Sequence, residues 1–340
     1  MMMRNGITAG GNWIIDLIKF VDCYPEQGHL ANIIRTEAPT NGGCPFNVLL
    51  DIARIEPSIP LQGVGVIGND EFGKFIIDTC KKNNIDTELI RSTTEQPTSY
   101  TDVITVESSG NRTFFHARGA NSILDIDDFK ISRIKGKICL LGYLLLLDKL
   151  DEPDREFGTR AARLLSILKE AGIETAVDVV SENSERFCKI VTPALKFTDY
   201  LILNEIEAGK ILNTRLRKQD GSISVDETLS SAKALLNLGV NKKVIIHFPE
   251  GASAAWREGT KIYSETIKSL KLPPGFIKGT VGAGDAFCAG ALCMIYEGKD
   301  MRETLEFAAG AAAASLSHPT ASLGIESKNQ ILNIIERYRK

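Results

Sequence analysis

Strand-like and helix-like segments alternate along the chain from residue 138 onward, and this alternation limits the folds that the chain can adopt. The runs with strand character are 138–141, 175–180, 200–203 and 244–247, and the runs with helical period are 155–171, 205–212, 225–238, 284–296, 302–317 and 328–337. Parallel strands joined by crossover helices form a sheet that is covered on both faces. The sequence therefore predicts an α/β fold with a mostly parallel central sheet flanked by helices.

The first third of the chain mixes such units with β-rich segments. The predicted elements are a strand at 7–16, short exposed strands within 19–39, a helix at 46–55, a strand at 63–68 and a helix at 70–83. Residues 99–106 and 113–117 flank Ser109-Gly110-Asn111, which is typical of a β-hairpin turn. A second hairpin is predicted at 254–256 and 261–263. The early chain thus combines an α/β scaffold with a separate patch of strands.

Composition disfavours several classes of protein. Of the 340 residues 43% are hydrophobic, and the net charge is −3 with scattered basic residues, which argues against disorder and against a nucleic-acid-binding stripe. The longest apolar run, 138–147, is too short to span a bilayer, and we expect no secretory signal. The seven cysteines include no Cys-x-x-Cys pair, and the four histidines lack the spacing of zinc ligands. A reduced, cytoplasmic protein is the simplest interpretation.

Two overlapping glycine patterns match nucleotide-binding motifs by spacing alone. Gly63-Val64-Gly65-Val66-Ile67-Gly68 has the spacing of a dinucleotide-binding fingerprint, but its apolar residues make it the strand itself rather than the following turn. Residues 68–74 have most of a P-loop, but Phe75 stands where a hydroxyl residue should reach magnesium. We interpret the stretch as a strand and a helix start, with Phe72 and Phe75 facing inward.

The stretch Gly279-Thr280-Val281-Gly282-Ala283-Gly284-Asp285-Ala286-Phe287 carries the clearest chemistry. Small residues precede an acid and an apolar run, which predicts a glycine-rich turn that opens a helix. The first N–H groups of a helix have no internal partner, and the dipole there favours anions. Amides from Gly282 to Asp285 can therefore stabilise developing charge, while Asp285 accepts the proton of an attacking hydroxyl. The alternative is an ordinary helix N-terminus with a capping acid.

This stretch resembles the C-terminal signature of the PfkB, or ribokinase-like, carbohydrate kinases, which usually reads Asp-Thr-x-Gly-Ala-Gly-Asp-x-Phe. The chain matches the signature at Thr280, Gly282, Ala283, Gly284, Asp285 and Phe287, and departs from it at Gly279. Further family motifs follow in order, so the resemblance extends from Gly10 to about Ser322. It implies a ribokinase-like fold in which residues 1–340 form one kinase domain, with a small β-sheet lid built from about 19–39 and 98–118.

For the sugar site the resemblance implies two motifs and an arginine: Asn12 and Asp16, then Gly42, Gly43 and Asn47, and Arg118. In the family the acid at the position of Asp16 hydrogen-bonds sugar hydroxyls, and the glycine pair lets the sugar approach the backbone. The alternatives are a solvated strand end and a turn followed by an N-cap. Arg118 can bind an acidic group of the substrate, bind the γ-phosphate or face solvent, and Phe114 and Phe115 are expected to pack within the lid.

For magnesium and nucleotide, Asn204-Glu205-Ile206-Glu207 matches the family's Asn-x-x-Glu motif. Asn204 and Glu207 share a helix face and can hold Mg²⁺ through water, whereas the alternative is an N-cap with a capping box. The implied nucleotide-binding residues are Asn204, Thr280, Gly282, Gly284, Gly251 and Ser315, and Asp178 can face the Mg²⁺ and phosphates. The family's Thr-x-Gly-x-x-Gly loop is only partly matched at 247–252, and Thr320 replaces a usual glycine.

The resemblance implies phosphorylation of a primary hydroxyl of a sugar or related small polyol, with ATP as co-substrate, Mg²⁺ as cofactor and Asp285 as base. Two alternatives stay open: a nucleoside kinase of the same family, with the base stacked on Phe20, Tyr24, Phe46 or Tyr143, and a non-catalytic sugar-sensing member. A homodimer through the lids is expected, without nucleic-acid or membrane partners. Potassium-responsive relatives usually carry Asp where this chain has Gly279, so potassium activation is expected to be weak or absent.

Overall fold

The main sheet of the protein has nine strands in the order β16-β15-β14-β13-β12-β9-β1-β5-β6 in the computed structural model, which describes residues 4–182 and 184–339. Their bounds are β1 Ile7–Gly11, β5 Leu61–Gly68, β6 Ile85–Thr93, β9 Ile138–Leu144, β12 Glu174–Val179, β13 Tyr200–Asn204, β14 Lys243–Phe248, β15 Gly251–Glu258 and β16 Lys261–Lys268. Strands from β6 to β14 pair in parallel, and β15 and β16 extend one edge in antiparallel pairing. The mostly parallel sheet expected from the alternating segments is confirmed.

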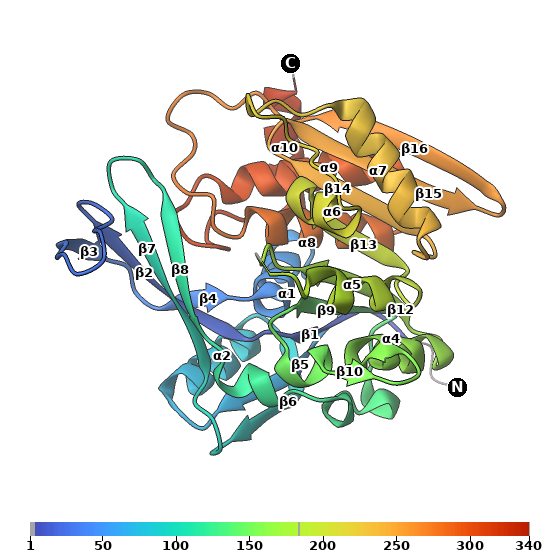
Figure 1. Cartoon of the computed structure of the whole chain (residues 1–340), viewed down its shortest axis with the longest axis horizontal. Coiled ribbons are helices and arrows are strands. Elements are labelled where there is room, and N and C mark those ends of the chain that lie inside the picture. The colour runs from blue at the N-terminus through green and yellow to red at the C-terminus, as the bar shows by residue number, and fades with distance from the viewer. Residues whose placement is uncertain (1–3, 183, 340) are drawn as a thin grey trace.

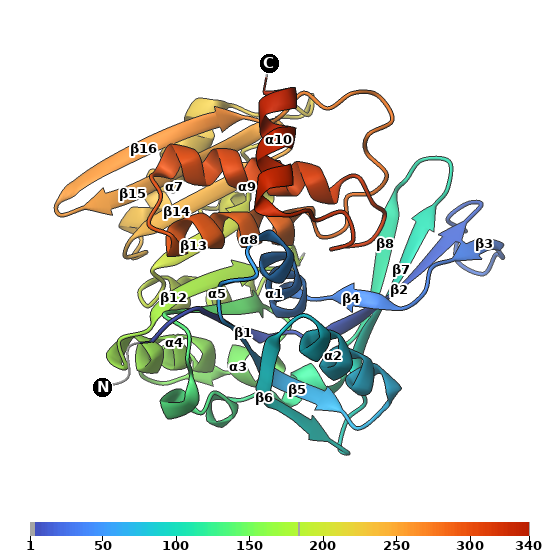
Figure 2. The same cartoon turned by 180° about the vertical axis from the view of Figure 1, so that it is seen from behind.

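Helices cover both faces of this sheet (Figures 1 and 2). One face carries α1 (Cys44–Ile55), α2 (Glu71–Lys82), α8 (Ala283–Tyr296), α9 (Met301–Ser315) and α10 (Lys328–Tyr338), and the other carries α3 (Asp148–Asp151), α4 (Arg160–Glu170), α5 (Phe187–Leu195), α6 (Glu205–Ile211) and α7 (Val225–Asn237). Each face buries its own apolar cluster. Because α8 is buried from Asp285 to Ile295, its N-terminus is fixed within the body of the protein.

A second, smaller sheet projects from the body (Figure 1). It contains β2 (Ile14–Val21), β3 (Ile33–Thr36), β4 (Thr40–Gly42), β7 (Ser99–Val106) and β8 (Arg112–Ala117), in the order β3-β2-β7-β8 with β4 also paired to β2. Burial alternates along β7, so one face of this sheet is covered and the other is more open. We call it the lid sheet; it begins at Ile14, earlier than the segment 19–39 expected from the sequence.

The strand expected at 7–16 is instead two strands that belong to different sheets, and Trp13 lies between them. The indole Nε1 of Trp13 donates to the Val64 carbonyl at 2.8 Å. A Cβ at Gly63 or Gly65 would lie 2.7 or 2.2 Å from the indole ring. The glycine spacing in β5 therefore makes room for a tryptophan, and the interpretation of 63–68 as a strand is confirmed.

Other local expectations were wrong for identifiable reasons. The helix expected at 155–171 begins at Arg160, because Asp154 accepts hydrogen bonds from the amides of Glu156 and Phe157 and forms a turn. The residues on either side of this turn pair as β10 (Pro153–Asp154) and β11 (Gly158–Thr159). Phe75 is 38% exposed rather than inward, and the buried side of α2 is formed by Ile76 and Cys80.

The lid and the segment after β8 also differ from expectation. Phe114 and Phe115, which were expected to pack within the lid, are 58% and 54% exposed. Three short 3₁₀ helices follow β8, at Gly119–Ile123, Ile126–Asp128 and Ile131–Arg133.

All seven cysteines are free thiols. Within the described residues, no helix combines the length and apolar character needed to cross a membrane.

Candidate active site

The glycine-rich turn at 279–282 leads into α8, as the sequence predicts. Gly282 is the N-cap with φ of 74°, and a Cβ there would lie 2.6 Å from the Cα of Ala321, so both conformation and space favour glycine. No side chain from the described part of the chain caps this helix end. The amides of Gly284 and Asp285 at the first turn are therefore left for a ligand.

Asp285 lies in this first turn and is held by two other elements. Asn47 Nδ2 of α1 donates to Asp285 Oδ2 at 2.8 Å, and the Tyr143 hydroxyl of β9 donates to Oδ1 at 2.6 Å. Burial raises the pKa of Asp285 to about 6, and the two hydrogen bonds oppose that rise. The carboxylate is therefore oriented and largely ionised at neutral pH. Sequence reasoning missed this role of Tyr143, because nothing in the local sequence indicates that β9 ends beside α8.

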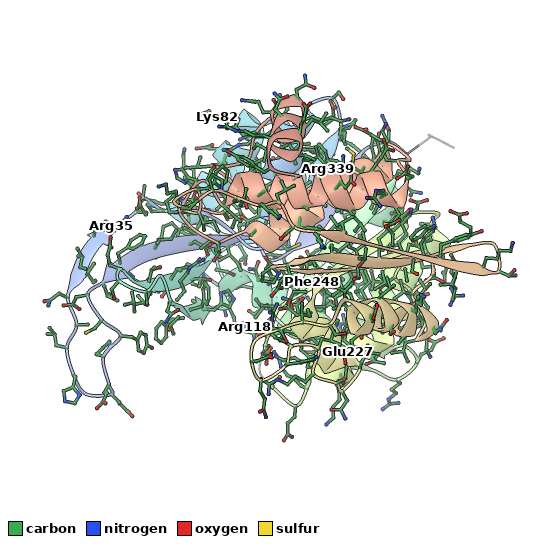
Figure 3. All side chains as sticks on the ribbon, turned by 90° about the horizontal axis from the view of Figure 1, so that it is seen from above. Arg35, Lys82, Arg118, Glu227, Phe248 and Arg339 are labelled. Carbon is green, nitrogen blue, oxygen red and sulfur yellow. The ribbon has the colours of Figure 1, made fainter. Side chains whose placement is uncertain are left out.

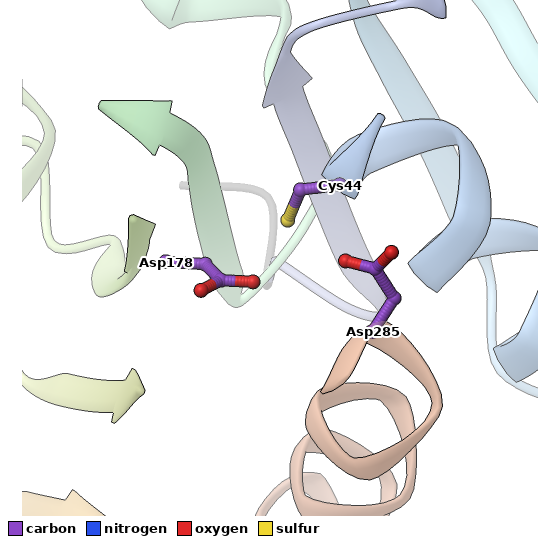
Figure 4. Close-up of side chains that lie close together, drawn as sticks. All are labelled: Cys44, Asp178 and Asp285. Carbon is purple, nitrogen blue, oxygen red and sulfur yellow. The ribbon is translucent and has the colours of Figure 1, made fainter. Parts of the chain in front are cut away.

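Asp178 and Cys44 complete a buried cluster with Asp285 (Figure 4). One ligand-type atom from each of the three side chains lies within 4.8 Å of the others. Burial raises the pKa of Asp178 well above its usual value, and the charges of Asp285 and Glu207 raise it further. Burial likewise raises the pKa of the Cys44 thiol. The cluster is thus an acidic, desolvated site next to the N-terminus of α8.

Asp16 approaches the same region from the lid sheet. It is buried, and the burial together with the charge of Asp285 raises its pKa to about 8. A Cβ at Gly42 would lie 2.3 Å from Asp16 Oδ1, so the glycine makes room for this carboxyl group. Asn41, which sequence reasoning also missed, donates from Nδ2 to Asn47 Oδ1 at 2.6 Å. The predicted sugar residues Asp16, Gly42 and Asn47 are therefore brought together near Asp285.

Asn12 and Gly43 have evident structural roles in this region. The side chain of Asn12 is fully buried; its Oδ1 accepts from the Tyr143 amide, and its Nδ2 donates to the Leu146 carbonyl at 3.1 Å. Gly43 has φ of 83°, and a Cβ there would lie 2.0 Å from the Asn12 carbonyl oxygen. Asn12 thus positions the segment that carries Tyr143, and its contact with a sugar stays a prediction.

Arg118 is bound to neighbouring groups rather than to the Asp285 cluster. Its Nη1 donates to the Leu145 carbonyl at 2.8 Å and lies 3.1 Å from an oxygen of Asp148. Figure 3 shows Arg118 toward the centre of the molecule, whereas Arg35 lies on the projecting lid sheet. Its role toward a substrate stays a prediction.

The Asn-x-x-Glu motif forms a complete capping box at the start of α6. Asn204 Oδ1 accepts from the amides of Ile206 and Glu207, each at 2.9 Å, and Glu207 Oε2 accepts from the Asn204 amide at 2.9 Å. Glu207 Oε1 accepts from the Ser181 hydroxyl at 2.7 Å. Burial raises the pKa of Glu207 to about 7. The capping geometry weighed as the alternative is present, and the magnesium role stays a prediction.

The remaining nucleotide-binding predictions fall on residues with visible structural roles. A Cβ at Gly251 would lie 2.1 Å from the Ile267 carbonyl oxygen, and the Ser315 hydroxyl donates to the Ala312 carbonyl at 2.8 Å. Thr280 accepts a hydrogen bond from Arg112 of β8, so the lid sheet reaches the turn before α8. Contacts of these residues with nucleotide stay predictions.

His247 at the end of β14 lies beside the same turn. A Cβ at Gly284 would lie 3.4 Å from His247 Cε1, and the imidazole packs on Phe287 with ring centroids 4.9 Å apart. Burial lowers the pKa of His247 to about 4, so its ring is neutral at pH 7. A neutral, buried ring thus lies against the turn that opens α8.

Known proteins with similar sequences are sugar kinases. A family model described as "pfkB family carbohydrate kinase" matches residues 6–328. The 5-dehydro-2-deoxygluconokinase of Clostridium perfringens is 26% identical over 308 residues, which cover 88% of this chain and 85% of that protein. The ribokinase of Schizosaccharomyces pombe is 25% identical over 289 residues, which cover 84% of each protein.

Solved structures show the same fold. The ribokinase of Thermotoga maritima superposes with a TM-score of 0.76 at 20% identity, over 98% of this chain and 99% of that one. The Arabidopsis thaliana ribokinase complexed with ribose and ATP gives a TM-score of 0.75 at 23% identity, with the same coverage.

Proposed function

This chain belongs to the PfkB family of carbohydrate kinases and has a ribokinase-like fold, and from that premise we propose that it transfers the γ-phosphoryl group of ATP to a primary hydroxyl of a sugar or small polyol. The observation that carries the proposal is the setting of Asp285. Its carboxylate is buried, held by Asn47 and Tyr143, and located in the first turn of a helix that no described side chain caps. A base and an anion-binding group are thus adjacent.

In the proposed reaction the sugar hydroxyl attacks the γ-phosphorus while its proton passes to Asp285. The bond from the γ-phosphorus to the β,γ-bridging oxygen breaks, and ADP leaves. Amides at Gly284 and Asp285 stabilise charge on the phosphoryl oxygens. The pKa of about 6 suits a base that works at neutral pH. Phosphoryl transfer requires little more than positioning and electrostatic stabilisation, and this arrangement supplies both.

Magnesium fits the acidic side of this site. The charges of Asp285 and Glu207 both raise the pKa of Asp178, and a divalent cation would offset that repulsion. Because the side-chain oxygens of Asn204 and Glu207 already accept hydrogen bonds, they would hold the ion through its water molecules, which Mg²⁺ retains readily. When bound, the ion neutralises charge on the β- and γ-phosphate oxygens.

We place the sugar between the body and the lid sheet, against Asp16, Gly43 and Asn47. The lid would exclude water that could otherwise take the phosphoryl group. Two of the four residues proposed for stacking a nucleoside base have other partners: Phe46 is fully buried against Trp13, and the Tyr143 hydroxyl is bonded to Asp285. These contacts argue against Phe46 and Tyr143 as stacking surfaces, whereas Tyr24 is 50% exposed, so a substrate assay must decide between sugar and nucleoside.

A coupled assay of ADP release tests the function. The panel contains D-ribose and 5-dehydro-2-deoxygluconate, which correspond to the names of the two relatives described above, D-fructose as a further sugar, and the nucleosides adenosine and uridine. We expect at least one of the sugars to raise ADP release about tenfold or more above the sugar-free rate. Turnover of nucleosides alone would support the nucleoside kinase, and sugar binding by calorimetry without ADP release would support a sensor.

We further propose a homodimer joined through the lid sheets. Leu30, Ile33 and Ile34 are 82%, 57% and 53% exposed, and β3 is an edge strand of that sheet. Exposed apolar edge strands invite pairing with another chain. Sedimentation should give a dimer for the wild type and a monomer after all three residues are changed to Ser. A variant that stays dimeric would place the interface elsewhere.

A further inference from the structure

A row of polar side chains crosses the covered face of the lid sheet. Asp16 of β2 pairs with Thr40 of β4 on one side and with Thr101 of β7 on the other, and Thr101 in turn pairs with His116 of β8. Directly paired residues on neighbouring strands project to the same face of a sheet. Thr40, Asp16 and Thr101 are 8%, 8% and 7% exposed, so the row faces the body of the protein.

His116 has a solvent-shielded ring nitrogen without a hydrogen-bond partner among the described residues. The other ring nitrogen, Nδ1, lies 3.0 Å from the Thr101 hydroxyl oxygen, which fixes the ring. The shielded nitrogen is Nε2. Leaving such an atom unpaired in a buried site costs free energy, so a polar partner is expected.

The position of the row indicates what that partner is. The Asp16 carboxyl group lies against Gly42, where a Cβ would be 2.3 Å from its Oδ1. The preceding Asn41 bonds to Asn47, which in turn bonds to Asp285, so the Asp16 part of the row adjoins the proposed base. Adjacent strands are about 4.8 Å apart, so His116, two strands beyond Asp16, lies about 10 Å further across the sheet. A sugar that presents its primary hydroxyl to Asp285 and lies along the row would bring its far end toward His116.

We infer that Thr101 and His116 form a specificity pair of the sugar site, in which His116 Nε2 hydrogen-bonds a hydroxyl of the substrate remote from the phosphorylated one. The inference rests on the proposed function, and it adds to the sugar site two residues and a substrate hydroxyl that they recognise. Burial and the charge of Arg118 lower the pKa of His116 to about 4, so the ring is neutral at pH 7. A hydroxyl can serve either tautomer of a neutral imidazole, because it both donates and accepts.

The test replaces His116 by Phe, which keeps a ring but removes both nitrogens, and by Gln, which restores a polar atom. Thr113→Ala is the matched control, because Thr113 lies three residues earlier on β8 and alternates to the opposite face. The probe is whichever of ribose, fructose or 5-dehydro-2-deoxygluconate is turned over, together with its single-deoxy analogues. Loss of one neutral hydrogen bond should lower kcat/KM of His116→Phe by about two- to tenfold.

The decisive result is non-additivity. With one deoxy analogue, His116→Phe should change kcat/KM by less than about twofold, because the hydroxyl that it would have lost is already absent. His116→Gln should recover part of the loss, and Thr113→Ala should stay within about twofold of wild type. An equal loss with every analogue, or no loss with the full sugar, would overturn the inference.

Calorimetric measurement of sugar binding distinguishes a failure of this inference from a failure of the proposed function. If a sugar binds by calorimetry but is not phosphorylated, the kinase proposal fails, and the same deoxy comparison is made on dissociation constants. If none of the probe sugars binds the wild type, both are overturned.

Discussion

The N-termini of α8 and α6 carry an acid at the same position, and the two helix ends use it differently. Asp285 and Glu207 are each the third residue of their helix. Glu207 turns back to the amide of its own N-cap, Asn204, whose side chain in turn accepts from the amides of the first turn. Asp285 is instead bonded by Asn47 and Tyr143 from other elements, and its N-cap is a glycine with no side chain to offer.

This difference shows how a helix end becomes a ligand site. A capping box satisfies the free amides of a helix within the chain, which stabilises the helix and leaves few donors for a ligand. A glycine N-cap leaves those amides unsatisfied, which is tolerable where an anion supplies the missing acceptor. We therefore expect α8 to act directly on the reacting groups and α6 to act on magnesium only through water.

The largest effect should come from Asp285→Asn. The amide keeps the shape of the side chain but cannot take the proton, so turnover should fall by about 10²–10⁴-fold with sugar affinity nearly unchanged. Steady-state ADP release and calorimetry measure the two quantities. Asp226→Asn, which alters an acid in the first turn of α7, is the control and should leave turnover unchanged. A rate within about threefold of wild type would remove Asp285 from the role of base.

The second-largest effect should be a loss of kcat/KM at low pH. Because burial raises the pKa of Asp285 to about 6 and the base must be ionised, kcat/KM should fall about tenfold per unit as the pH drops below about 6. The residual activity of Asp285→Asn over the same range corrects for protonation of ATP. Wild-type and variant profiles of the same shape would show that another group controls the decline.

A smaller effect should follow Glu207→Gln at the capped helix end. Gln can still accept from the Asn204 amide and removes the cost of burying a carboxylate whose pKa burial raises to about 7, so the free energy of unfolding should not fall. The Mg²⁺ concentration for half-maximal rate should rise several-fold, because an ionised carboxylate near Asp178 is lost.

Ser224→Ala is the control for this variant, because it removes the N-cap hydrogen bond of α7. It should lower the free energy of unfolding by about 1 kcal/mol without changing the magnesium dependence. An unchanged dependence in Glu207→Gln as well would make the α6 motif purely structural.

The extent to which the sequence could predict the site depends on whether a contact lies within one short stretch of the chain or joins different elements. Motifs carried by one short stretch, such as the turn before α8 or the capping box of α6, were predictable because local spacing determines them. Tyr143 and Arg112 were missed, because their contacts with Asp285 and Thr280 join residues that are 142 and 168 positions apart. Distant contacts depend on the order of strands in the sheet, which no local pattern contains.

The fold shows the same limit. The alternation after residue 138 predicted the main sheet, whereas the division of 7–16 into two sheets depends on the packing of Trp13 against β5. The outward position of Phe75 likewise could not be read from helical period, because the inner side of α2 is decided by what it packs against.

The smallest expected effect concerns Gly279, at the entrance to the uncapped end of α8. A Cβ at this position would lie 2.6 Å from the Cα of Pro319 and 3.0 Å from the His318 carbonyl oxygen, so a carboxylate-bearing side chain would need the backbone to move. An acid at this position is therefore both absent from the chain and excluded by packing. Initial rates in potassium and in tetramethylammonium should agree within about twofold at equal ionic strength, which keeps screening constant. A rise of about tenfold in potassium, equivalent to about 1.4 kcal/mol of transition-state stabilisation, would mean that backbone carbonyls alone bind the cation beside the α8 turn.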